Sequence, residues 1–128
     1  MSVDRAGRDE LINAVIDRDA DLVERLLSRG ANPNSVDHAG WSPLHFAAQD
    51  NDAGMVRTLL RSGASLSLRD AYGNTPLSRA VFAYRGEAEC ISVLLEAGAD
   101  PDEANDYSVS PRSLAHTVAN YDTRKFFP

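Results

Sequence analysis

Three histidines and one cysteine are the most obvious candidates in this chain for a general base, a nucleophile or a metal ligand. They are His38, His45, His116 and Cys90. Metal sites built from such residues use close spacings such as His-x-x-x-His or Cys-x-x-Cys, and the sequence has neither. It also lacks the G-x-S-x-G, Walker A and G-x-G-x-x-G patterns of nucleophilic catalysis and nucleotide binding. We therefore expect no enzyme, no cofactor and no metal site.

The elements around these residues are helical. Ser42 is suited to cap a helix, because its hydroxyl can accept a hydrogen bond from an amide of the first turn. Pro43 fits the next position, where its fixed φ is helical and its missing N–H costs nothing. Cys90 falls on an apolar stripe with helical spacing, where a thiol behaves as a small hydrophobic side chain. Cys90 is therefore expected to be buried and unreactive.

The helical signals recur with a period of about 33 residues. Leu11, Leu44 and Leu77 are 33 residues apart, and later leucine pairs and Gly-Ala pairs recur after 33 and then 35 residues. A period of this length is typical of a solenoid of helix pairs. The spacing predicts a single domain over residues 1–128, with repeats at about 4–36, 37–69 and 70–104 and a C-terminal capping repeat at 105–128.

The run Ser42-Pro43-Leu44-His45-Phe46-Ala47-Ala48 resembles the T-P-L-H-x-A-A motif of ankyrin repeats, and weaker copies begin at residues 75 and 110. The resemblance implies an all-α repeat solenoid of stacked helix-turn-helix units joined by β-turn or hairpin loops. It also implies that the motif histidine is structural, bonded to the Ser42 cap and to the next turn. A non-catalytic protein-binding module is the function that the family implies.

Two regions depart from the repeat. Two extra residues lie between the helices of the third unit, within 82–89, and predict a longer aromatic loop around Tyr84 and Arg85. The fourth unit is short: residues 121–127 are expected to form its second helix. Phe126 and Phe127 are expected to cover the last apolar face, since the end of a solenoid must be closed.

The charge of the chain points to a protein partner of opposite sign. The net charge is −6, and residues 73–107 carry two arginines against seven acids. An acidic chain disfavours nucleic acid and anionic membranes and favours a basic protein. A single cysteine, no apolar leader and no long apolar run indicate a cytoplasmic protein, which we expect to be monomeric when free.

The expected contact surface is the concave face formed by the turns and the first helices. The only tryptophan and three of the four tyrosines fall on this face or on the insertion, and Trp, Tyr and Arg dominate binding hot spots. An alternative for Trp41 and Tyr72 is packing over neighbouring turns. Whether the concave face or the insertion makes the contact is left open. The predicted partner-binding residues are His38, Trp41, Gln49, Asp50, Arg69, Tyr72, Asn74, Phe82, Tyr84, Arg85 and Tyr107.

Two binding functions fit these features. One is a stoichiometric inhibitor that covers a basic partner, such as the immunity protein of a bacterial toxin. The tail at 115–127 resembles the endings of small bacterial ankyrin proteins, some of which are immunity proteins of polymorphic toxin systems, and twelve arginines to one lysine are compatible with a GC-rich bacterial genome. The other is an adaptor that links cytosolic proteins without inhibiting them.

Overall fold

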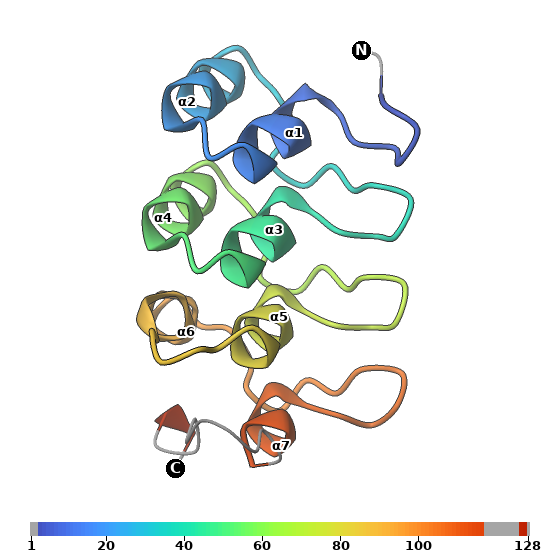
Figure 1. Cartoon of the computed structure of the whole chain (residues 1–128), viewed down its shortest axis with the longest axis vertical. Helices are drawn as coiled ribbons and strands as arrows, with labels where there is room; N and C mark the ends of the chain where they lie inside the picture. The colour runs from blue at the N-terminus through green and yellow to red at the C-terminus, as the bar shows by residue number, and fades with distance from the viewer. Residues whose placement is uncertain (1–2, 117–125, 128) are drawn as a thin grey trace.

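In the computed structural model, each of the first three repeats consists of a hairpin loop followed by a pair of short helices, and the fourth has a hairpin loop and one described helix (Figure 1). The structure describes residues 3–116 together with 126 and 127, and within them it contains helices and no strand. The all-α repeat fold predicted from the sequence is confirmed. The helices are α1 (Glu10–Ile16), α2 (Ala20–Ser28), α3 (Pro43–Gln49), α4 (Ala53–Arg61), α5 (Pro76–Phe82), α6 (Glu89–Glu96) and α7 (Pro111–Ala115).

The helices form two columns, with the hairpin loops projecting beside one of them (Figure 1). The first helices α1, α3, α5 and α7 pack on one another in chain order, and α4 packs on α6 in the second column. Leu44, Leu77 and Leu59 are at most 1% exposed between the columns. Helices of seven to nine residues are marginal alone, so this shared core must stabilise them. None of the helices in the described part of the chain has the length and apolar content needed to span a membrane.

A side-chain cap begins each first helix, as the sequence predicts. Asp9, Ser42, Thr75 and Ser110 have extended backbones and accept a hydrogen bond from the amide three residues later. Such a bond satisfies one of the amides that a helix start leaves without a partner. The caps fix where each helix begins, and therefore how far each hairpin extends from the stack.

The hairpins are held by an acidic or amide side chain at their base. Asp37 Oδ1 accepts from the amides of Ala39 (3.0 Å) and Trp41 (2.9 Å). Asp4, Asp70 and Asn105 make the corresponding pairs of bonds in the other repeats. One backbone bond then joins each hairpin to the next, with lengths of 2.8, 2.8 and 2.9 Å. The hairpins therefore form a continuous row, whose links are His38 N to Ala6 O, Ala71 N to Ala39 O, and Asp106 N to Tyr72 O.

A glycine allows the third and fourth hairpins to approach closely. Gly73 has φ +83°, and a Cβ atom on it would lie 2.7–2.8 Å from Asp106, partly against its backbone. We expect Gly73→Ala to lower the free energy of unfolding by about 2 kcal/mol, from left-handed strain together with the clash. Gly63→Ala is the matched control, since Gly63 has φ +94° but nothing within 4 Å of the added Cβ. Urea denaturation would measure both, and equal losses would exclude a role for close hairpin packing.

The C-terminal end of the stack is closed by aromatic side chains. Phe127 is 3% exposed, and the ring of Phe126 packs edge-on against Tyr84 at a centroid distance of 5.8 Å. These contacts agree with the predicted covering of the last apolar face. The predicted helix at 121–127 falls mostly outside the described residues, as does most of the tail at 115–127.

Candidate interaction surface

His45 joins two repeats from a buried position at the start of α3. Its Nδ1 accepts from Ser42 N at 3.1 Å and lies 2.8 Å from Ser42 Oγ. Since Nδ1 accepts, Nε2 carries the proton and donates to the Asn74 carbonyl, 2.8 Å away in the next hairpin. The structural role that the family resemblance implies for this histidine is confirmed. Burial is the largest cause that lowers the pKa of His45, so the ring is neutral near pH 7.

The other potentially reactive side chains are not brought together. His38 is exposed in the second hairpin, and His116 is exposed at the end of α7. Cys90 is fully buried on α6 and packs in the core near the carbonyl of Ala47. Within the described residues, no group of His, Cys, Asp and Glu is arranged to hold a metal ion.

Burial raises the pKa of Cys90 to about 12, with a further contribution from the charges of Asp52 and Glu89. We expect native protein at about pH 8 to react with iodoacetamide more than tenfold more slowly than unfolded protein, since the thiolate is the nucleophile. Because the folded pKa is raised, the thiol's contribution to stability is complete below its unfolded pKa and is lost as pH rises towards 12. Cys90→Ser is the control, and rapid labelling of the native chain would contradict the buried assignment.

Aromatic rings and arginines alternate along the surface next to the hairpins. The guanidinium of Arg8 lies 5.4 Å from the Phe46 ring centroid, and the Phe46 ring lies 4.8 Å from that of Trp41. Arg79 lies 4.7 Å from Trp41 and 5.0 Å from Phe82, with centroid distances in the range of cation–π contacts. We call this surface the inner face and define it by Arg8, Trp41, Phe46, Gln49, Arg79 and Phe82.

The inner face contains three of the predicted site residues and three that the sequence reasoning missed. Trp41, Gln49 and Phe82 were expected there, whereas Arg8, Phe46 and Arg79 were not. The signal for Phe46 and Arg79 was available: both occupy the variable position of the helix-opening motif, between the fourth residue and the following alanine. A motif position that the fold does not constrain faces outward from the first helix and is free to serve binding.

A second group of exposed aromatic residues lies at the hairpin tips. Tyr72 is 60% exposed and Tyr107 is 70% exposed, with ring centroids 6.3 Å apart. Arg69 braces the base of these hairpins through Asp106 (3.2 Å), Glu103 (3.6 Å) and the Ala104 carbonyl (3.0 Å). The pair therefore presents two rings on a backbone that is held in place.

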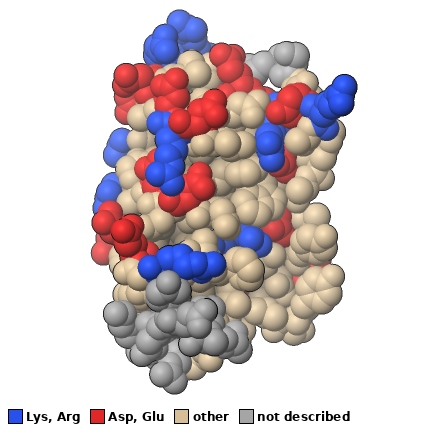
Figure 2. Space-filling view, viewed as in Figure 1, with Lys and Arg blue, Asp and Glu red and all other residues tan. Residues whose placement is uncertain are grey.

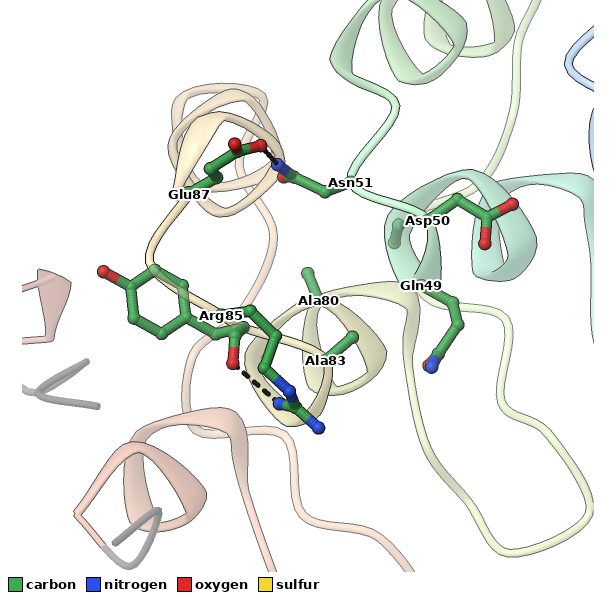
Figure 3. A pocket seen from close by; sticks show the side chains of 9 residues that line it. Gln49, Asp50, Asn51, Ala80, Ala83, Arg85 and Glu87 are labelled. Atoms are coloured by element: carbon green, nitrogen blue, oxygen red, sulfur yellow. Dashed lines mark hydrogen bonds between the residues drawn. The ribbon is translucent and has the colours of Figure 1, made fainter. Parts of the chain in front are cut away.

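Three other predicted residues, Asp50, Tyr84 and Arg85, lie near the insertion, where a pocket of about 310 Å³ opens between the second and third repeats (Figure 3). Asp50 and Arg85 line it; Arg85 donates to the Tyr84 carbonyl at 2.7 Å. Glu87 accepts from Asn51 on the opposite side at 3.2 Å. Tyr84 corrects our expectation of an exposed aromatic loop: it is only 6% exposed, because Phe126 from the chain end covers it.

The last two predicted residues serve mainly to hold the hairpins. Asn74 is half-buried; its carbonyl accepts from His45 and its side chain accepts from Asn105 Nδ2 at 2.9 Å. The ring of His38 lies directly over Gly7 of the first hairpin. His38 is exposed, and no ring or ion-pair contact joins it to the inner face or to the tyrosine pair within the described residues.

Charged side chains are unevenly distributed. In the view of Figure 2 they gather over the helices and the first hairpins, while the lower hairpins present mainly uncharged surface. Two acids of the third repeat are already engaged, since Arg112 binds Asp102 at 2.7 Å and Arg69 lies 3.6 Å from Glu103. Three further acids are exposed: Glu89 begins α6, Glu96 ends it, and Asp100 lies in the turn that follows.

Comparison with known proteins supports the repeat assignment. A family model for ankyrin repeats in three copies matches residues 11–105, well over half of the chain. A search of curated proteins gives no match.

Proposed function

The chain belongs to the ankyrin repeat family, whose repeats serve as protein–protein interaction modules, and from this premise we propose that it binds a basic protein and inhibits it by covering it. Members of this family are typically non-catalytic. The fold alone does not identify the partner, so the proposal rests on the surface. The contact that we propose uses the inner face and the tyrosine pair at the hairpin tips.

The observation that carries this proposal is the concentration of aromatic and arginine side chains on one side of the stack. Phe46, Trp41, Arg79 and Phe82 follow one another in a series of contacts, and Tyr72 and Tyr107 add two exposed rings at the hairpin tips. Such residues dominate the binding energy of protein interfaces when they are buried by a partner. Phe82 is 54% exposed, so a large apolar area is available for burial.

The proposed partner is basic because the chain carries a net charge of −6. The total charge of a protein steers a partner of opposite sign and increases the association rate, most strongly at low salt. A bacterial toxin such as a nuclease is the partner class that we favour, with this chain as its immunity protein. The support for that role comes from the sequence of the tail, whose residues resemble those of small bacterial ankyrin proteins.

The test is affinity capture from the source organism with the tagged full chain, followed by mass spectrometry. Two variant baits show whether capture uses the proposed surface. The double variant Tyr72→Ala/Phe82→Ala alters this surface, while Arg57→Ala alters an exposed position of α4 in the other column. We expect the captured protein to be basic, to be lost from the first variant and to be retained by the second. Capture that is equal for both variants would contradict the proposed surface.

Inhibition is tested separately with the purified partner. We expect its activity to fall to background at a one-to-one ratio, and its toxicity in a bacterial host to be relieved when the chain is co-expressed. A toxin-like gene beside the gene for this chain would add support. A partner that binds and stays fully active would exclude inhibition and leave the adaptor function.

A further inference from the structure

We propose that Arg79 is a receptor for one carboxylate of the partner, an Asp or Glu side chain that enters the inner face. The inference deepens the proposed function. It rests on that function in one respect, which is that the natural ligand is part of a protein. Its basis is the arrangement of the Arg79 guanidinium relative to the surrounding rings, amide and carboxylates.

The guanidinium of Arg79 is fixed but only partly bonded. Its carbon lies 4.7 Å from the Trp41 ring centroid and 5.0 Å from that of Phe82. Its Nε donates to Gln49 Oε1 at 3.3 Å. Among the described residues, neither terminal nitrogen of Arg79 forms a hydrogen bond. The two terminal nitrogens are the part of the group that can bind a carboxylate with two parallel bonds.

Three arginines near the hairpins differ from Arg79 in having a carboxylate close by. Arg8 lies 3.7 Å from Asp37, Arg69 binds Asp106 and Arg112 binds Asp102. No carboxylate of the described residues lies within 4.0 Å of Arg79.

Asp70 is the acid whose charge acts on Arg79. Its Oδ1 accepts from two turn amides, those of Tyr72 and Asn74, at 2.9 Å each, and its Oδ2 is buried without a hydrogen-bond partner among the described residues. Neither oxygen lies within 4.0 Å of an Arg79 nitrogen. The charge of Asp70 therefore acts on Arg79 without a direct contact, and the terminal nitrogens stay available to an external carboxylate.

The surroundings of Arg79 favour such a ligand. The residue is half-buried, and burial is the main cause that lowers its pKa from the usual value, although the group stays charged. A guanidinium that has lost part of its hydration gains more from a carboxylate than a fully solvated one does. The two rings hold the plane of the group, so little conformational freedom is lost on binding.

One carboxylate at this point is compatible with a basic partner. Steering depends on the total charge of both proteins, while the contact at Arg79 involves a single pair. The same net charge of −6 disfavours strongly acidic ligands. The site is therefore expected to select a carboxylate at one position of a segment that is not acidic overall.

A displayed library of random twelve-residue peptides without tryptophan tests the proposal directly. The peptides are fused through their C-termini, so that only side-chain carboxylates are offered. Selection is run in parallel on the full chain and on Arg79→Gln, with Arg57→Gln as the control on α4. Trp41 is the only tryptophan, so its fluorescence reports binding of each recovered peptide.

We expect Asp or Glu to be enriched at one peptide position with the wild-type chain and with Arg57→Gln, and not with Arg79→Gln. Replacing that Asp by Asn, or that Glu by Gln, should weaken peptide binding tenfold or more to the wild-type chain and less than twofold to Arg79→Gln. With Arg79→Lys, the affinity should again depend in part on the peptide carboxylate. Thermal melting of the variants shows that each is folded.

Three results would overturn the assignment: peptides without an acidic position, affinities that depend on the peptide carboxylate equally in wild type and Arg79→Gln, or recovery of no binder. The outcome is independent of whether a natural partner is captured. If no partner is captured but peptide binding depends on both the carboxylate and Arg79, only the proposed function is rejected. If a partner is captured but peptide binding does not depend on Arg79, only this inference is rejected.

Discussion

Replacing His45 by alanine is expected to lower the free energy of unfolding by about 3 kcal/mol. The variant leaves the buried Ser42 amide without its acceptor on Nδ1 and removes one donor from the Asn74 carbonyl. It also leaves a cavity at a side chain that is fully buried. Denaturation with urea measures the change. Ser78→Ala is the matched control, because Ser78 occupies the same position of the third repeat and supports the Thr75 cap with its backbone amide.

The same histidine makes stability depend on pH. Burial lowers the pKa of His45 below its usual value of about 6.5, so the folded chain holds the neutral ring. The stability that this provides is complete above the unfolded pKa and is lost as pH falls through the lower folded pKa. We expect the difference in stability between wild type and His45→Ala to shrink on acidification below about pH 6.5. A difference that stays constant from neutral to acidic pH would contradict the neutral, bonded histidine.

Trp41→Ala is expected to weaken binding of the protein partner by about 2 kcal/mol or more, close to thirtyfold in Kd. Trp41 is central to the inner face, where its ring contacts Phe46 on one side and Arg79 on the other. Removing it takes away apolar contact area and one of the two rings that hold the guanidinium. Calorimetric titration of the purified partner measures the loss.

Trp41→Ala is also expected to destabilise the free chain slightly. Since Trp41 is half-buried and packed on two side chains, we expect about 1 kcal/mol of stability to be lost with it. Trp41→Phe should retain part of both effects, and Arg57→Ala should alter neither. If folded Trp41→Ala binds the partner with unchanged affinity, Trp41 serves only in packing between turns.

The fold follows from the sequence because a few physical constraints recur at a fixed period. Leu44 and Leu77 mark the buried side of successive first helices, and Ser42 and Thr75 fix where those helices begin. Asp37 fixes the turn before them through two amides. Each constraint is local in the chain, so the repeat boundaries can be read without knowledge of distant contacts.

The interaction surface could be predicted only in part, because it depends on contacts between repeats. An aromatic residue in an inserted loop reads as exposed, yet Phe126, more than forty residues away, covers Tyr84. Arg79 reads as an ordinary helix arginine until its contacts with Trp41 and Phe82 are seen. Tyr72 and Tyr107 were found because the hairpin places them at its tip whatever the neighbouring sequence is.

The central claim is that the inner face and the hairpin tips form the protein-binding surface, and amide hydrogen exchange in the presence and absence of the purified partner tests it most directly. We expect added protection at the hairpin residues 71–74 and 105–109, in α3 and in α5, with α2, α4 and α6 unchanged. Protection confined to α2, α4 and α6 would contradict it.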